Sequence, residues 1–245
     1  QEREAELALS LPHPNIVRCL GTLTTEAAGG ANQEGMGTGG VAFLVFEHVP
    51  GTLLDLIQGR PGGLSQPEVT SLLEQLLSAV DCLHRHGVVH RDIKPENILV
   101  DKRNPGAPVL CDLGTARKVG ELEASPRALR EAPEGGARRC GTGWTEYVGS
   151  RWYRAPEMLA GSVDYGLAVD VWACACLAAE MRSGRPLFPG EDEGELAISI
   201  AALLGPLPPV VAANLRGMGF TPPPPRGRPT RSLEACLDGS TGHYE

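Results

Sequence analysis

The sequence predicts an α+β fold, with strands in the first half of the chain and the longest helices spread over the rest. Two short apolar segments, 16–24 and 41–49, are typical of strands. Two longer segments, 66–85 and 168–181, have the length and apolar pattern of helices. With 245 residues and 42% hydrophobic content, the chain can build one sizeable core or most of a two-lobed domain.

The first fifty residues predict the end of a helix and two strands. Leu7 and Leu11 lie four residues apart, and the Pro-His-Pro-Asn sequence at 12–15 ends that helix. Between the two strands, residues 26–40 are rich in Gly and Ala, so we expect a flexible hairpin insertion there. Their glycines lack the spacing of a phosphate-binding loop, which argues against nucleotide binding by this insertion.

The middle of the chain predicts two helices and a hairpin. Residues 52–58 are expected to form a short helix. Ser65 and Glu68 have the spacing of a capping box, and the helix after them runs to about Arg85 with one broad apolar face. The apolar segments 98–100 and 109–111 flank an Asn-Pro-Gly sequence, which predicts a hairpin that turns there.

The second half predicts two more helices between irregular segments. Residues 121–143 are charged, rich in Gly and Ala and aperiodic, so we expect a disordered loop insertion. A mostly apolar helix over 168–181 carries Asp170 near its start, and another helix covers 194–204. From residue 205 the chain is proline-rich, which favours an extended connector; its four consecutive prolines, 222–225, could also bind as a polyproline ligand.

Composition excludes several classes of partner and environment. The net charge of −8 argues against a general nucleic-acid binder, because phosphate backbones require a basic face. The sequence has no clean run of eighteen apolar residues, so no membrane span is expected, and its start does not resemble a signal peptide. The seven cysteines lack the Cys-x-x-Cys spacing of zinc sites. Their number is odd and most lie in apolar stretches, which indicates small buried thiols and a reducing compartment such as the cytoplasm.

One stretch carries the chemistry: His-Arg-Asp-Ile-Lys-Pro-Glu-Asn at residues 90–97. It places Asp92, Lys94 and Asn97 within six residues, and Asp112 follows fifteen residues later. Phosphoryl transfer from a metal-bound nucleotide needs such a set, since its catalysis is mainly positioning and charge neutralisation. An aspartate can take the proton of the accepting hydroxyl, and an amide oxygen and a second carboxylate can hold Mg²⁺.

This stretch resembles the catalytic loop of protein kinases. Two further motifs follow in the order that family has: Asp-Leu-Gly at 112–114, with Leu in place of the usual Phe, and Ala-Pro-Glu at 155–157. The resemblance implies a two-lobed fold. Residues 1–49 would form a partial N-lobe with the end of helix C and two strands. Residues 50–245 would form a partial, mainly helical C-lobe with catalytic loop 90–97 and activation segment 112–157.

The resemblance also implies roles for single residues. Asp92 would be the catalytic base, Lys94 would contact the γ-phosphate of ATP, and Asn97 with Asp112 would bind Mg²⁺. The Glu47 carbonyl and the Val49 backbone would hold the adenine. Glu4 would be the helix C glutamate, or otherwise a solvated helix acid.

The supporting side chains and the substrate class follow from the same resemblance. Asp170 would cap the backbone of the catalytic loop, and His90 would be a packed side chain rather than a proton shuttle. Lys94, two residues after the aspartate, is typical of serine/threonine kinases, so the partners would be ATP and proteins with Ser or Thr acceptors.

The stretch 145–157 resembles the group that holds cyclin-dependent and mitogen-activated kinases, and 186–190 and 203–209 resemble the cyclin-dependent kinase-like family most. Thr145 and Tyr147 match a dual phosphorylation site for an upstream kinase, or are simply exposed in a mobile loop. The three basic side chains expected to receive the phosphates are Arg91, Arg151 and Arg154. Family members often favour proline or arginine near the target serine, and several act at cilia; the nucleus is a further location this family implies.

The match begins inside helix C and stops before the last helices of the family's fold. The glycine-rich loop and the strand lysine have no counterpart in these residues. We therefore expect the chain to be a fragment of a longer kinase, inactive as it stands. The alternative is a non-catalytic pseudokinase or scaffold that keeps the C-lobe surface.

Overall fold

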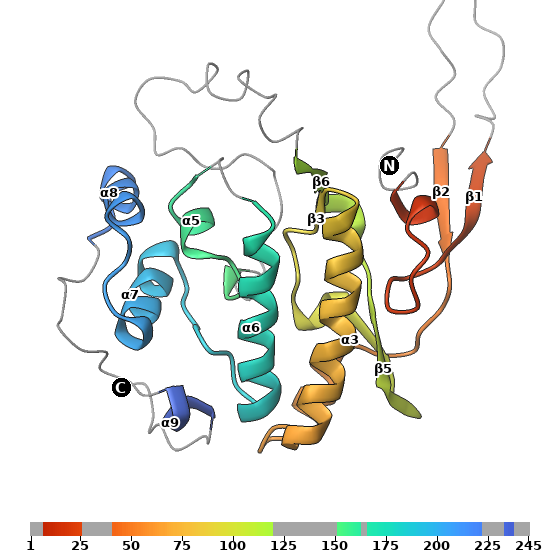
Figure 1. Ribbon diagram of the computed structural model, residues 1–245, viewed down its shortest axis with the longest axis horizontal. Helices are drawn as coiled ribbons and strands as arrows, with labels where there is room; N and C mark the ends of the chain where they lie inside the picture. The colour runs from red at the N-terminus through yellow and green to blue at the C-terminus, as the bar shows by residue number, and fades with distance from the viewer. Residues whose placement is uncertain (1–6, 26–40, 120–150, 163–165, 222–232, 238–245) are drawn as a thin grey trace, which may run out of the picture.

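A computed structural model of the chain describes residues 7–25, 41–119, 151–162, 166–221 and 233–237. Helix and strand are mixed, as the sequence predicts. The paired strands β1 and β2 stand at one side of the molecule, and helices dominate the other (Figure 1). The predicted insertions at 26–40 and 121–143, and the prolines at 222–225, lie outside the described residues.

The N-terminal part holds one antiparallel strand pair. Residues 7–10 are helical, and β1 (Cys19–Thr25) pairs with β2 (Val41–Phe46). Strand β1 begins three residues later than predicted because the chain before it bonds elsewhere. The Val17 amide donates to the Leu110 carbonyl at 2.8 Å, and the Leu110 amide donates to the Asn15 carbonyl at 2.8 Å. This segment thus joins the strand pair to the rest of the molecule.

Two capped helices follow. In α2 (Leu53–Gln58), Thr52 and Asp55 form a capping box, and in α3 (Gln66–Arg85), Ser65 and Glu68 form another. The predicted bounds of both helices are confirmed to within a residue. The apolar face of α3 is buried in the main core, and the helix packs against α6 and β5.

Four short strands flank the loop at 90–97. Strand β3 (Val88–Val89) pairs with β6 (Arg117–Lys118), and β4 (Ile98–Asp101) pairs with β5 (Asn104–Leu110). The hairpin is where the sequence predicts it, but its expected turn at Asn-Pro-Gly is wrong. The chain turns at residues 102–103, because the Asp101 carboxylate accepts a hydrogen bond from the Arg103 amide at 2.9 Å. The Asn-Pro-Gly sequence therefore lies inside β5.

The C-terminal part is helical in its described residues. Its helices are α5 (Pro156–Leu159), α6 (Ala168–Ser183), α7 (Glu193–Leu204), α8 (Pro209–Gly217) and α9 (Leu233–Leu237). Helix α6 is apolar on most of its sides, which is typical of a helix enclosed by protein. The extended connector predicted from residue 205 is wrong for 209–217 and for 233–237, which are helical. Pro209 takes the first helical position of α8, where a missing N–H costs little.

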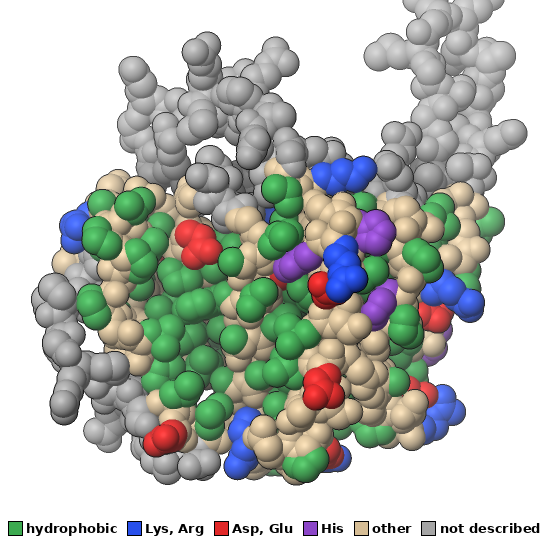
Figure 2. Space-filling model, in the orientation of Figure 1, with side chains coloured by type: hydrophobic (Ala, Val, Ile, Leu, Met, Phe, Trp, Pro, Cys, Tyr) green, Lys and Arg blue, Asp and Glu red, His purple; other side chains and the backbone are tan. Residues whose placement is uncertain are grey.

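Part of the surface is apolar. Figure 2 shows hydrophobic side chains gathered over the region of α6 and α7, and these helices carry the exposed residues Val171, Ile198 and Leu204. On the strand pair, Leu23 and Phe43 face each other across β1 and β2, and both are more than half exposed. No helix in the described ranges has both the length and the apolar character needed to cross a bilayer.

Candidate active site

The loop at 90–97 is held in place by the strands and the short helix around it. It begins after β3 and ends in the 3-10 turn η1 (Pro95–Asn97), which leads directly into β4. The Asn97 amide donates to the Lys94 carbonyl at 3.0 Å, and the Cys111 amide donates to the Asn97 carbonyl at 2.9 Å. The end of β5, and with it Asp112, is thereby fixed beside Asn97.

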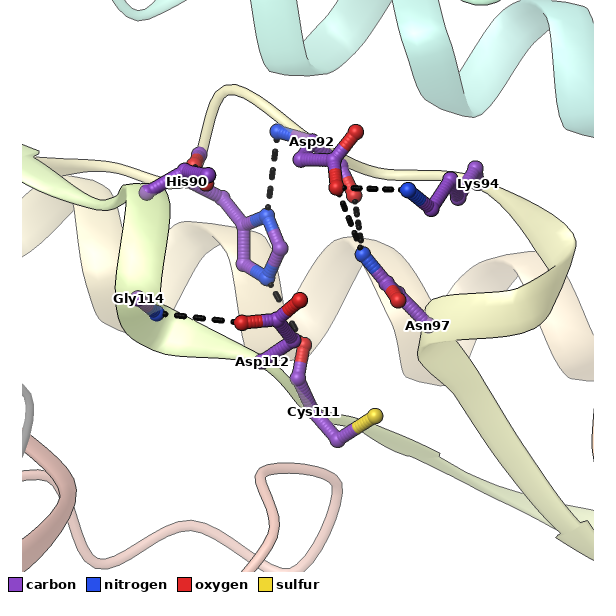
Figure 3. Close-up of polar contacts among 8 residues, drawn as sticks. His90, Asp92, Lys94, Asn97, Cys111, Asp112 and Gly114 are labelled. Carbon is purple, nitrogen blue, oxygen red and sulfur yellow. Dashed lines mark hydrogen bonds and ion pairs between the residues drawn. The ribbon is translucent and has the colours of Figure 1, made fainter. Parts of the chain in front are cut away.

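Asp92 lies at the centre of a polar group (Figure 3). Lys94 Nζ is 2.7 Å from Asp92 Oδ2. Asn97 Nδ2 donates to the same oxygen at 3.0 Å and to the Asp92 carbonyl at 2.8 Å. The Asp92 side chain is 21% exposed and that of Lys94 is 18% exposed, so both are fixed by neighbours yet open to a substrate. Because Asn97 donates through its nitrogen, its side-chain oxygen stays available as a ligand.

Asp112 stands at the start of a second 3-10 turn, η2 (Leu113–Thr115). Its backbone is left-handed, with φ of 62°, and its carboxylate accepts from the Gly114 amide at 3.2 Å. Cys111, just before it, accepts a hydrogen bond from His90 Nε2 on its carbonyl at 3.0 Å. Burial raises the pKa of the Cys111 thiol to about 11, and the negative charge of Asp112 adds to the effect. The thiol therefore stays protonated beside the acids.

The donor chemistry fits a hard divalent cation. The Asn97 side-chain oxygen and the Asp112 carboxylate are oxygen ligands of the kind that Mg²⁺ prefers. Within the described ranges, no group of three or more His, Cys, Asp or Glu side chains could hold a metal ion. A cation at Asn97 and Asp112 would therefore complete its coordination with water and nucleotide oxygens, as Mg²⁺ does in phosphoryl-transfer sites.

The backbone of the loop is braced from α6. Asp170 is 1% exposed, and its carboxylate accepts from the amides of His90 and Arg91, each at 2.9 Å. His84 Nε2 on α3 donates to the same carboxylate at 2.9 Å. A buried carboxylate needs such partners. The capping role expected for Asp170 is confirmed, and His90 is fully buried, as expected of a packed side chain.

Comparison with known proteins agrees with this geometry. The protein kinase domain family matches residues 1–204. The chain belongs to the protein kinase family. It is 40% identical to "Cyclin-dependent kinase-like 2" of Pongo abelii over 207 residues, which are 84% of this chain and 35% of that protein. The resemblance to cyclin-dependent kinase-like proteins is thus confirmed.

Two further relatives show the same kinship. The chain is 39% identical to "Cyclin-dependent kinase-like 5" of Homo sapiens over 169 residues, covering 69% of this chain and 16% of that protein. It is 35% identical to "Cyclin-dependent kinase-like 4" of Mus musculus over 207 residues, covering 84% of this chain and 51% of that protein. The chain spans about a third of the length of the "Cyclin-dependent kinase-like 2" protein of Pongo abelii.

The expected adenine-binding segment lies between β2 and α2. Strand β2 ends at Phe46, so Glu47 and Val49 are in the linker that follows it. The Glu47 amide donates to the Arg18 carbonyl at 3.0 Å, while its side chain accepts from the Arg18 amide at 3.0 Å. The Val100 amide donates to the Gly51 carbonyl at 2.8 Å, which ties this linker to the strand that follows the catalytic loop.

The predicted phosphate-binding arginines are only partly brought together. Arg91 and Arg154 line one small pocket together with Asp92 and Asp170. Arg151 lies in an ion pair with Glu193 of α7, with its Nη1 3.3 Å from Glu193 Oε1. Glu4, Thr145 and Tyr147 lie outside the described residues.

A buried polar pair close to the site was not predicted from the sequence. The Tyr153 hydroxyl donates to Glu180 Oε2 at 2.6 Å, and Glu180 is 3% exposed. The sequence pattern that could have indicated it is Glu180 itself, an acid within a mostly apolar helix, ten residues after Asp170. The roles of His84 and Thr115 were not predicted either, because their hydrogen-bond partners lie far away in the chain.

Proposed function

We propose that this kinase transfers the γ-phosphoryl group of Mg-ATP to serine or threonine hydroxyls of proteins. The observation that carries the proposal is the arrangement of Lys94 and Asn97, both within 3.0 Å of the same Asp92 oxygen. A carboxylate held in this way keeps a fixed direction, so it can orient an accepting hydroxyl and take its proton. Lys94, half-buried beside it, can neutralise charge on the moving phosphoryl group.

Each further residue has a defined part. Asn97 and Asp112 would hold Mg²⁺, which when bound neutralises the phosphate oxygens. The Glu47 carbonyl and the Val49 backbone would form hydrogen bonds with the edge of the adenine. Both residues follow the end of β2, where the strand pairing stops. The similarity to cyclin-dependent kinase-like proteins supports serine or threonine as the acceptor, and Lys94 at its place after Asp92 supports the same choice.

We further propose that phosphorylation of Thr145 and Tyr147 by an upstream kinase raises activity. Two phosphates would add roughly −3 to −4 charge to the activation segment. A guanidinium fork matches phosphate oxygens, and Arg91 and Arg154 lie at a common pocket next to Asp92.

Replacing Asp92 tests the proposal. We expect Asp92→Asn to lower kcat by roughly 10²- to 10⁴-fold, because the amide cannot take the hydroxyl proton. The measurement is Mg-ATP-dependent phosphorylation of a basic or proline-directed peptide by the full protein. The matched control is Asp81→Asn, which removes a carboxylate from an exposed ion pair with Arg85 on α3.

Two outcomes would contradict the proposal. One is wild-type protein that is no faster than Asp92→Asn, which would favour a non-catalytic scaffold. The other is equal loss of rate in Asp92→Asn and Asp81→Asn, which would point to a general effect of removing an acid.

A further inference from the structure

The peptide bond between His90 and Arg91 is held at both of its polar atoms. Its N–H, on Arg91, donates to Asp170 Oδ1 at 2.9 Å. Its carbonyl, on His90, accepts from the Thr115 hydroxyl at 2.9 Å. The partners come from α6 and from the end of η2, so two separate parts of the chain hold one peptide plane, a residue before Asp92.

Arg91, the residue after this peptide bond, has an unfavourable backbone conformation. Arg91 has φ of 72°, and within the described ranges it shares a left-handed backbone with just one other non-glycine residue, Asp112. L-residues avoid this region because Cβ crowds the carbonyl oxygen, so surrounding contacts must maintain it. Arg91 directly precedes Asp92, the proposed base, and Asp112 is itself one of the residues proposed to hold Mg²⁺.

Thr115 connects the two strained residues. It ends the 3-10 turn that Asp112 begins, and that turn is closed by the Ala116 amide donating to the Leu113 carbonyl at 3.0 Å. The Thr115 carbonyl accepts a hydrogen bond from Arg91 Nε at 2.7 Å and another from Arg91 Nη2. Thr115 thus holds the backbone before Arg91 through its hydroxyl and the side chain of Arg91 through its carbonyl.

We propose that Thr115 is a positioning residue that fixes the left-handed Arg91 and thereby the direction of Asp92 relative to Asp112. The hydroxyl is the part of Thr115 that a substitution can remove, because the carbonyl belongs to the backbone. The structural half of this inference concerns the loop alone. Its catalytic half rests on the proposed kinase activity.

Removal of the hydroxyl tests the structural half. Thr115→Val keeps the branched shape and loses one hydrogen bond, so we expect amide hydrogen exchange at residues 90–91 of the 245-residue chain to rise about 3- to 10-fold. Thr115→Ser keeps the hydroxyl and should restore slow exchange. Thr115→Ala removes the hydroxyl without adding bulk, so it should also raise exchange and shows whether valine acts only by disturbing packing. The matched control is Thr70→Val on the exposed face of α3, where the threonine accepts one weak hydrogen bond at 3.4 Å.

The catalytic half is measured on the full protein. We expect Thr115→Val to lower kcat roughly 10-fold with little change in the KM for ATP, since the loop is displaced while nucleotide contacts remain. Thr115→Ser should recover most of this rate.

The outcomes separate the two halves. Unchanged exchange at residues 90–91 in Thr115→Val, or an equal rise in Thr70→Val, would overturn the positioning role. A raised KM with unchanged kcat would overturn it as well. Faster exchange in a protein whose wild type transfers no phosphoryl group would support the role of Thr115 in the loop and contradict the proposed function.

Discussion

Glu180 shows how a single buried acid sets a pH dependence of stability. Burial raises its pKa to about 7; the hydrogen bond from Tyr153 opposes that rise, and the charge of Glu96 adds to it. In an unfolded chain the same group titrates near 4.5. The folded state therefore binds the proton more tightly, so the contribution of Glu180 to stability is fully present below pH 4.5. It is lost as the pH rises through about 7.

We expect Glu180→Gln to remove this dependence, because glutamine can still accept from Tyr153 but carries no charge at any pH. From pH 5 to pH 8, the free energy of unfolding of the variant should gain roughly 2–3 kcal/mol relative to wild type. Urea unfolding at both pH values measures it. Glu74→Gln, exposed on α3, should stay parallel to wild type. If the free energy of unfolding of Glu180→Gln changed with pH in parallel with wild type, ionising Glu180 would cost no more in the folded than in the unfolded chain.

At the scale of elements, the start of α3 and the end of α6 meet through two glycines. Gly63 has φ of 77° and Gly184 has φ of 72°, and the Leu64 amide donates to the Met181 carbonyl at 2.6 Å. A Cβ on Gly63 would overlap the Arg182 carbonyl. The close approach of the two backbones positions α3 against α6, which together carry His84 and Asp170.

Gly63→Ala should therefore destabilise the protein more than its backbone conformation alone predicts. Gly87→Ala is the matched control, since Gly87 has φ of 68° but open space around its Cβ position. We expect Gly87→Ala to cost about 1–2 kcal/mol and Gly63→Ala clearly more. Thermal unfolding measures both; at this chain length 1 kcal/mol shifts Tm by about 2–4 °C. Equal shifts would mean that the α3 and α6 backbones separate without cost.

The elements also show what sequence could and could not predict. Helix α3 was predictable to its ends because a capping box and an apolar face act locally. The hairpin turn was not, because the Asp101 carboxylate competes with Asn-Pro-Gly and decides the turn. The octet at 90–97 identified the polar residues of the site, and the structure brings Asp92, Lys94 and Asn97 together. His90, at the start of the octet, is bonded by Thr115 from 25 residues away and by Asp170 from 80 residues away. No local pattern encodes such contacts; the resemblance to protein kinases predicted the one with Asp170 but not the one with Thr115.

At the scale of the whole molecule, the catalytic loop lies where separate parts of the chain converge. Helix α6 contributes Asp170, α3 contributes His84, and the residue after β5 contributes the Cys111 carbonyl. Arg91 and Arg154 line a small pocket at the same place, together with Asp92 and Asp170. The assignment of residues 1–49 and 50–245 to two lobes stays a prediction. Under the proposed regulation, phosphates on Thr145 and Tyr147 would act on Asp92 through Arg91, because Arg91 directly precedes Asp92 in the chain.

We therefore expect the double substitution of Thr145→Ala and Tyr147→Phe to lower the kcat of the full protein at least about 10-fold after incubation with an activating kinase. The physical reason is that the Arg91 and Arg154 charges would lose the phosphates that we propose pair with them. Peptide phosphorylation measures the rate, and mass spectrometry confirms that wild type carries both phosphates. Thr22→Ala, at an exposed position on β1, is the control for loss of a hydroxyl. A fully phosphorylated wild type that is no faster than the double variant would show that Arg91 and Arg154 serve only the fold.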